Sequence, residues 1–322
     1  MSREPLLRVE GLSKTYRAPG WLARSRPGIQ ALQDVCLSLF RGETLGLVGE
    51  SGSGKTTLSR IILRLLEADS GSVRFDGIEL LSLSPRRLRP LRRRMQAVFQ
   101  DPYGSLNPRM KVGAIVGEGL AIFREGGRRS RVARVSELLE LVGLPPSAAG
   151  RYPHEFSGGQ RQRIGIARAL ALEPDFLICD EPVSSLDVSV QAQILNLLAD
   201  LQDRLCLTCL FIAHDLAVVE NLADRVAVMY RGRIVEVGPA ATIYARPLHP
   251  YTRLLLDSVP VPDPAVAPPA LPKTVSTPED GDGCRFYPRC GARRPSCRSA
   301  VPRLEELAPG HTVACFRAGE KE

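Results

Sequence analysis

A glycine-rich loop between a short apolar run and an amphipathic segment constrains this chain more than any other feature. Residues 44–48 read TLGLV, the loop GESGSGKTT follows, and residues 58–66 are mainly apolar. A strand, loop and helix in this order form a cradle whose backbone N–H groups and helix dipole face a polyphosphate. Lys55 is expected to reach the β- and γ-phosphates, and the Thr56 hydroxyl to bind Mg²⁺. The predicted cradle comprises Gly49, Glu50, Ser51, Gly52, Ser53, Gly54, Lys55, Thr56 and Thr57.

Composition sets the broad class of the protein. The chain has 322 residues, of which 44% are hydrophobic, enough for two or three domains with a substantial core. Its net charge of +8 favours contact with an anionic ligand or surface, but the basic residues are spread along the chain and select no partner. No stretch reaches the ~18 apolar residues of a membrane span, and no signal-peptide core follows the first residues. These features predict a globular cytosolic protein.

The order of the segments predicts an α/β fold. Within residues 1–259, strand-rich blocks, including a small antiparallel layer near 71–77, flank a helical block at about 102–168. Residues 260–280 contain seven prolines and are predicted to form a linker. A small cysteine-containing tail follows at 281–322. The Pro/Gly/Arg-rich residues 18–28 are expected to form a surface loop, in which Trp21 has no assigned role.

Polar side chains at strand ends complete a predicted nucleotide site. Asp180 and Glu181 end an apolar run, which favours Asp180 as a Mg²⁺ partner and Glu181 as the base for an attacking water. His214 ends the next buried strand and is suited to the γ-phosphate side, although such a histidine is more often structural. Gln100, also at a strand end, is expected to touch Mg²⁺ or the water. Together with Lys55, these side chains predict nucleoside triphosphate hydrolysis.

A second glycine motif carries a family resemblance. Residues 157–163 read SGGQRQR, and two glycines after a serine at a helix start form another phosphate-binding cap, which one active site does not need. This motif resembles the signature of the ABC-type ATPases, and the chain is similar to them over nearly its whole length, with Phe156 where leucine is commonest. The resemblance implies a RecA-like P-loop NTPase core with an antiparallel β layer and a helical subdomain.

The same resemblance implies roles for further residues. Two subunits sandwich ATP in this family, so the signature, with Ser157, Gly158, Gly159 and Gln160, would act on the partner's nucleotide. Tyr16 would stack on adenine, and Gln100 would be the Q-loop residue. The segment 185–187 would couple the two sites through Asp187, and His214 would be the switch histidine.

Three further segments resemble the ATP-binding subunits of dipeptide and oligopeptide importers. They read FQDPYGSLNP (99–108), YPHEF (152–156) and HPYT (249–252). Nickel and glutathione importers share much of this sequence. The resemblance implies a peripheral ATPase on the cytoplasmic face of the membrane, with two permease subunits, a second or identical ATPase subunit, and an extracytoplasmic binding protein as an indirect partner. It names neither the solute nor the choice between homodimer and heterodimer.

Two other classes are weighed against transport. Soluble ABC ATPases that act on DNA carry a long coiled coil before the signature, whereas only residues 101–156 separate Gln100 from Ser157 here. Soluble members that act on ribosomes usually carry two ATPase cassettes in one chain, and this sequence has one. No aromatic residues alternate with the arginines of 86–94, so nucleic acid is not an expected partner. A metal-sensing regulatory protein is a third option, supported by the tail cysteines alone.

Cysteine usage divides the chain in two. Cys36, Cys179, Cys206 and Cys209 lie in apolar segments and are expected to be reduced thiols. The tail spacing C-x5-C-x6-C-x17-C is compatible with zinc, an iron–sulfur cluster or packed thiols. Similarity to peptide-importer ATPases favours a [4Fe–4S] cluster. Its expected ligands are Cys284, Cys290, Cys297 and Cys315.

Overall fold

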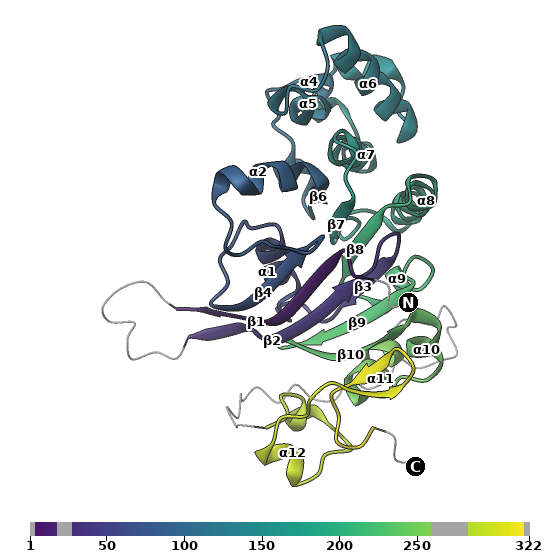
Figure 1. Ribbon diagram of the computed structural model, residues 1–322. Helices are drawn as coiled ribbons and strands as arrows, with labels where there is room; N and C mark the ends of the chain where they lie inside the picture. Colours follow the sequence, from purple (N-terminus) through teal and green to yellow (C-terminus); the bar gives the residue numbers. More distant parts are fainter. Residues whose placement is uncertain (1–3, 18–27, 259–282, 319–322) are drawn as a thin grey trace. The chain divides into compact units, whose positions relative to one another are not determined.

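The computed structural model describes residues 4–17, 28–258 and 283–318 (Figure 1). The chain folds into two compact units, each assembled from separate stretches of sequence. One comprises residues 1–6, 39–44 and 78–212, and the other residues 7–38, 45–77 and 213–322. Trp21 and the proline-rich segment predicted at 260–280 lie outside the described residues.

Three parallel strands organise the first unit. They are β6 (Met95–Val98), β7 (Phe176–Asp180) and β8 (Thr208–Ala213), in the order β6-β7-β8. Every residue of β7 and β8 is buried, as in parallel strands that are covered on both faces. The long helix α8 (Val188–Leu205) connects β7 to β8, and the two-residue strand β5 (Ile78–Glu79) opens the main stretch of this unit. The prediction of buried strands that end in polar residues is confirmed.

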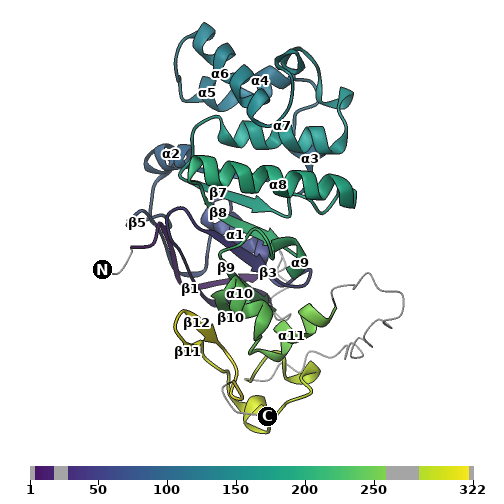
Figure 2. The same ribbon diagram turned by 90° about the vertical axis from the view of Figure 1, so that its right-hand side faces the viewer.

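The helical block of the first unit lies between β6 and β7 in sequence. Helices α4 and α6 pack on α7, and Figure 2 shows α4, α5 and α6 gathered beside it. Gly126 takes a left-handed φ of 62° in the break between α5 and α6, a conformation that glycine adopts without strain. The helices are α2 (Pro85–Arg94), α3 (Pro102–Ser105), α4 (Val112–Val116), α5 (Glu118–Ile122), α6 (Arg128–Leu141) and α7 (Gly158–Leu170), with 3₁₀ turns η2 (Pro146–Gly150) and η3 (Pro153–Glu155).

Helix α2 carries the basic run of the sequence. Leu88 and Leu91 are buried, whereas its arginines are largely exposed and three of them occupy the last turn, where cations complement the helix dipole. Arg94 also pairs with Asp175 at 2.5 Å. The basic run therefore forms a solvated helix face.

The second unit contains two groups of strands. The antiparallel layer has the order β2-β1-β4, from β2 (Ile29–Leu39), β1 (Leu7–Tyr16) and β4 (Ser70–Phe75). In the other group, β3 (Thr44–Val48) is parallel to β9 (Arg225–Tyr230), and β10 (Arg233–Pro239) forms an antiparallel hairpin with β9. The tail adds β12 (His311–Val313) to β10 and β11 (Glu305–Ala308) to β12.

Short helices complete the second unit. Helix α1 (Lys55–Ile62) follows β3, and the others are α9 (Leu216–Val219), α10 (Ala240–Ala245), α11 (Pro250–Asp257) and α12 (Ser296–Ser299), with the 3₁₀ turn η4 (Tyr287–Arg289). Across the described parts of the chain, the helices are all too short or too polar to cross a lipid bilayer.

Candidate functional site

The glycine-rich loop lies between β3 and α1, as predicted. Gly52 and Gly54 take φ values of 78° and 110°, at which the backbone of a residue with a side chain would be strained. A Cβ on Gly49 would collide with the Met229 carbonyl, and one on Gly54 would lie 2.5 Å from the Ala31 carbonyl oxygen. The loop can therefore curl closely only with glycine at these positions.

Lys55 lies inside this curl. Its side chain is 4% exposed, and Nζ donates to the carbonyl oxygens of Gly49 at 2.6 Å and Glu50 at 3.0 Å. A buried ammonium needs such partners because desolvation is costly. The result is a cation held at the centre of a loop that suits a polyphosphate.

An aromatic ring stands beside the first turn of α1. Tyr16 ends β1, is 42% exposed, and its hydroxyl lies 3.4 Å from the Thr57 hydroxyl. The end of β1 is held by Asp69, which accepts hydrogen bonds from the Lys14 ammonium at 2.9 Å and the Thr15 N–H at 2.7 Å. The Lys14 hydrogen bond lowers the pKa of Asp69, so this carboxylate stays charged. An exposed ring in a fixed position beside the phosphate loop is suited to stacking on a base.

Glu50, the second residue of the cradle, is held on three sides. Its backbone N–H donates to the Tyr251 hydroxyl at 2.9 Å, and its carbonyl accepts from Lys55. Its carboxylate accepts two hydrogen bonds from the Arg289 guanidinium, at 2.8 and 2.9 Å. No sequence motif pointed to a role for Tyr251 or Arg289.

In the first unit, two of the predicted residues meet. Gln100, just after β6, donates from Nε2 to a Glu181 carboxylate oxygen at 3.1 Å. Glu181 follows β7 with an unusual left-handed φ of 47°, and its N–H donates to the Ile212 carbonyl on β8 at 3.0 Å. Asp180, the last residue of β7, is 6% exposed. A strained non-glycine residue at a strand end is a mark of functional sites, where such strain costs about 1–3 kcal/mol.

The second glycine motif begins α7. Ser157 caps the helix in a reciprocal box: its hydroxyl accepts from the Gln160 N–H at 3.3 Å, and the Gln160 side chain accepts from the Ser157 N–H at 3.0 Å. A Cβ on Gly158 would lie 3.2 Å from Leu186, and one on Gly159 would collide with Val190. The two glycines therefore let the start of α7 approach the segment that carries Asp187.

Phe156, the departure from the commonest signature, is accommodated by packing. Its ring is 4% exposed and lies 4.3 Å from the Arg151 guanidinium carbon, a cation–π contact. Its carbonyl accepts two hydrogen bonds from Arg161, at 2.8 and 2.6 Å. Phenylalanine therefore leaves the start of the motif ordered.

His214 comes directly after β8 in the sequence, as predicted, and belongs to the second unit. Its side chain is exposed. Asp215 next to it caps α9, because its carboxylate accepts the Ala217 N–H at 2.9 Å. The histidine therefore stands at a defined strand-to-helix turn.

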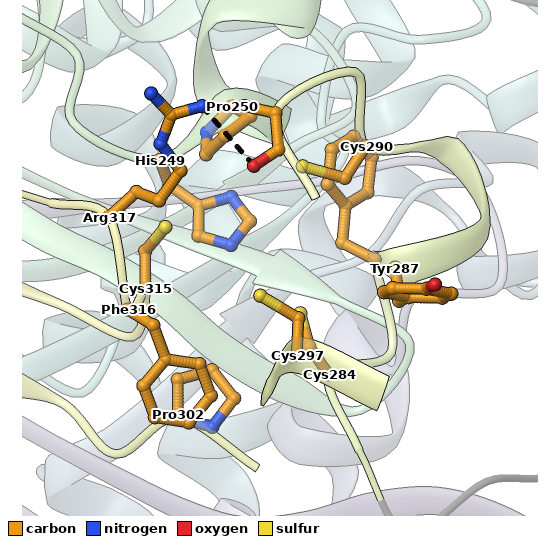
Figure 3. A pocket seen from close by; sticks show the side chains of 12 residues that line it. His249, Pro250, Cys284, Tyr287, Cys290, Cys297, Pro302, Cys315, Phe316 and Arg317 are labelled. Atoms are coloured by element: carbon orange, nitrogen blue, oxygen red, sulfur yellow. Dashed lines mark hydrogen bonds between the residues drawn. The ribbon is translucent and has the colours of Figure 1, made fainter. Parts of the chain in front are cut away.

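The four tail cysteines line one pocket (Figure 3), together with His249, Phe286 and other residues. All four are free thiols. Burial raises the pKa of Cys284 to about 11 and also raises that of Cys290, which favours protonated thiols without a ligand. In the part of the chain that the structure describes, no three His, Cys, Asp or Glu side chains are grouped so that they could hold a metal ion. The metal-binding prediction is thus not supported, because shared pocket walls do not by themselves bring the sulfur atoms into one coordination sphere.

The two family models that match describe this combination of features. An ABC transporter model matches residues 32–184, and a model of the C-terminal region of oligopeptide/dipeptide transporters matches residues 235–297. A putative peptide import ATP-binding protein of Brucella ovis is 52% identical over 98% of this chain and 99% of that protein. The chain belongs to the ABC transporter ATP-binding family. The putative oligopeptide transport ATP-binding protein YkfD of Bacillus subtilis is 47% identical over 98% of this chain and 96% of that protein.

Solved structures agree with this ABC ATPase assignment. The cassette MJ0796, a dimer bound to ADP and Pi, is similar with a TM-score of 0.65 and 30% identity, over 73% of this chain and 98% of that one. The cbiO1 protein of Clostridium perfringens, part of an ABC transporter complex, is similar with a TM-score of 0.66 and 30% identity, over 76% of this chain and 92% of that one. The predicted fold, an ABC ATPase core with an antiparallel layer and a helical part, is confirmed.

The ABC ATPase has a pH-sensitive side chain, His249, at the start of α11. His249 is 2% exposed, and its Nδ1 accepts the Tyr251 N–H at 3.0 Å, so the neutral imidazole caps α11. Burial lowers its pKa from 6.5 to about 4. Between these values the unfolded chain binds the proton and the folded chain does not, so the free energy of unfolding falls as the pH falls, by roughly 3 kcal/mol in total.

Chemical denaturation at a series of pH values from 7.5 to 4 tests this expectation. His249→Asn keeps a capping acceptor but does not titrate, so its free energy of unfolding is expected to depend less steeply on pH than that of the wild type. Equal pH dependence in the two proteins would show that His249 does not govern acid stability.

Proposed function

We propose that this protein is the ATP-hydrolysing subunit of a peptide importer, and that it drives a separate membrane permease. The observation that carries the proposal is 52% identity to a putative peptide import ATP-binding protein over nearly the full length of both chains. The match of the C-terminal region to an oligopeptide/dipeptide transporter model supports the same solute class. Nickel or glutathione import by the same machinery is the alternative within transport.

The nucleotide is proposed to bind along the phosphate loop. The curled backbone of Gly49–Gly54 suits the phosphates, Lys55 carries the cation for the β- and γ-phosphates, and Tyr16 offers its ring to adenine. Mg²⁺, when bound, would neutralise phosphate charge, and its proposed ligands are the side-chain oxygens of Thr56, Asp180 and Gln100. Ser51, Ser53 and Thr57 complete the loop.

Hydrolysis is proposed to use Glu181 as the base. Its carboxylate takes a proton from water, the water oxygen bonds to the γ-phosphorus, and the bond to the β–γ bridging oxygen breaks to release ADP and phosphate. The Gln100 hydrogen bond at 3.1 Å orients the carboxylate. His214 is proposed to contact the γ-phosphate side.

Two ATPase subunits are proposed to close on two nucleotides. The capped start of α7, with Ser157, Gly158, Gly159 and Gln160, would face the partner's ATP through backbone N–H groups and the helix dipole. Asp187, on the segment against which the two glycines pack, would couple the two sites. The dimeric state of the similar cassette MJ0796 supports this arrangement.

The proposed organisation follows the sequence-based boundaries. Residues 1–259 form the ATPase domain, its helical subdomain at about 102–168 receives the permease, and 260–280 link it to the tail at 281–322. The partners are two permease subunits, a second or identical ATPase subunit and, indirectly, an extracytoplasmic binding protein. The protein would lie peripherally on the cytoplasmic face of the membrane.

Purification of the tagged protein from membranes tests this function. Recovery of two multi-span subunits is expected, and addition of peptide with the cognate binding protein should stimulate ATP hydrolysis more than nickel or glutathione does. Recovery of ribosomal or DNA-bound proteins alone would overturn transport and leave the ATPase assignment intact.

The pocket lined by the four tail cysteines supports a second proposal, that Cys284, Cys290, Cys297 and Cys315 hold a [4Fe–4S] cluster. A cluster is larger than one ion, so its four thiolates stand farther apart than zinc ligands do. The four cysteines line one pocket, as the ligands of a single cluster must. When bound, such a cluster supplies a structural crosslink and a redox centre.

Metal analysis after anaerobic purification tests the cluster proposal. We expect about four iron and four sulfide per chain, as the cluster formula requires, with their loss in Cys297→Ala and retention in Cys206→Ala, an exposed cysteine outside the tail. Absence of iron and sulfide, with four thiols that react with a thiol reagent, would overturn it.

A further inference from the structure

The tail side chain Arg289 contacts the phosphate loop. Arg289, at the end of η4, directs both terminal nitrogens at the Glu50 carboxylate, Nη1 to Oε2 at 2.8 Å and Nη2 to Oε1 at 2.9 Å. This is the paired geometry in which arginine binds carboxylates most strongly. The Arg289 side chain is 14% exposed and that of Glu50 is 42% exposed. The two residues are 239 positions apart in the sequence.

The tail is anchored, so Arg289 is presented from a fixed support. Phe286 is 3% exposed and packs against the rings of Tyr230, Tyr251 and His249, with centroid separations of 5.2, 5.5 and 5.6 Å. Elsewhere in the tail, His311 on β12 bonds to the fully buried Glu236 on β10 at 2.8 Å. The Arg289 guanidinium also lies over the Tyr230 and Phe286 rings, at 5.8 and 5.9 Å.

Glu50 thereby connects the tail to Lys55, the cationic residue of the phosphate loop. Its carboxylate is held by Arg289, its N–H by the Tyr251 hydroxyl, and its carbonyl by the Lys55 ammonium. Without Arg289, a carboxylate would stand unneutralised in a loop built for phosphates. Repulsion between like charges would then oppose nucleotide binding.

We propose that Arg289 is a positioning residue for the phosphate loop: it neutralises and orients Glu50, so that the tail sets the affinity of the loop for a nucleoside triphosphate. The proposal rests on the proposed ATPase function and extends it, because it assigns to the tail a direct part in nucleotide binding. The cysteine pocket adjoins this contact, since Cys290 follows Arg289 in the chain and Phe286 lines the pocket.

A charge-removal cycle on the full-length protein tests the proposal. We measure the Kd for MgATP by calorimetry, and the KM and kcat of hydrolysis, for the wild type, Arg289→Ala, Glu50→Gln and the double variant. Arg289→Ala is expected to raise Kd and KM about three- to tenfold, between the effects of an exposed and a buried ion pair, with kcat changed less than about twofold. In the double variant most of this loss is expected to be recovered, because the repelling charge is gone.

Recovery by Glu50→Gln separates positioning from a merely structural role. If Arg289 only holds the tail in place, loss of affinity will persist in the double variant, and that outcome overturns the proposal. Unchanged affinity in Arg289→Ala overturns it as well. A higher salt concentration should reduce the difference in Kd for MgATP between Arg289→Ala and the wild type, because salt screens the exposed Glu50 carboxylate.

A control variant and a substitute variant complete the experiment. Arg293→Ala removes an exposed arginine of the tail, whose guanidinium carbon lies 5.6 Å from the Tyr287 ring centre, and is expected to leave Kd unchanged. Should Arg289→Ala fail to fold, Arg289→Met with and without Glu50→Gln carries the same comparison, since methionine removes the charge and keeps an unbranched side chain. Failure of the wild type itself to bind MgATP would refute the proposed function and is distinguishable from failure of this inference.

Discussion

Glu181→Gln is expected to lower the rate of ATP hydrolysis at least about a hundredfold while ATP still binds, because glutamine cannot accept the proton of the attacking water. The substitution preserves the shape of the side chain. It also preserves an oxygen that can accept the Gln100 Nε2–H, which lies 3.1 Å from Glu181. The left-handed backbone at Glu181, with a φ of 47°, should persist because its N–H remains bonded to the Ile212 carbonyl.

Phosphate release under saturating MgATP measures the rate, and size-exclusion chromatography measures association. The variant should accumulate as an ATP-bound dimer, since closure no longer ends in hydrolysis. Gln100→Ala is the companion variant: it removes a hydrogen-bond donor to Glu181 but keeps the base, so it should retain more activity than Glu181→Gln. Wild-type turnover in Glu181→Gln would remove Glu181 from the proposed mechanism.

Lys55→Ala is the second change with a large expected effect. The ammonium is 4% exposed, and in the structure it bonds to the carbonyls of Gly49 and Glu50 inside the phosphate loop. A triphosphate would offer it stronger, charge-assisted partners, and their loss should weaken MgATP binding by about a hundredfold. Hydrolysis should then be undetectable at ATP concentrations that saturate the wild type.

Calorimetric titration with MgATP checks this expectation. Lys111→Ala is a matched control, because Lys111 is an exposed lysine in the other unit, 5.9 Å from the Tyr152 ring centre. Its affinity for MgATP should equal that of the wild type. Lys55→Ala should keep the circular dichroism of the wild type, and tight MgATP binding by that variant would contradict the assignment of the loop.

Local patterns in the sequence predicted most of the elements. The five-residue run 176–180 is buried throughout, and the glycine-rich loop joins a strand to a helix as its pattern indicated. These elements depend on neighbours in sequence: apolar runs, glycines with positive φ, and helix caps such as Ser157 with Gln160. The hydrogen bond from Gln100 to Glu181 was not predicted, and it forms because β6 and β7 are adjacent parallel strands that end at one edge of the sheet.

The tail shows where such patterns end. The cysteine spacing predicted a metal-binding group, yet in the described residues the side chains share a pocket without forming a coordination sphere for one ion. Spacing along the chain constrains only which cysteines can approach one another. Whether their side chains converge depends on the turns between them, which the spacing does not record.

By itself, the sequence determined that this protein has an ATP-binding cassette with its phosphate loop, signature and acidic strand end, because each motif is a short run whose chemistry and backbone needs are local. Tertiary structure alone decided that Arg289 reaches Glu50 and that Tyr251 holds the Glu50 N–H. Those contacts join residues 239 and 201 positions apart. They depend on how the tail packs against β9, β10 and α11, which no local pattern records.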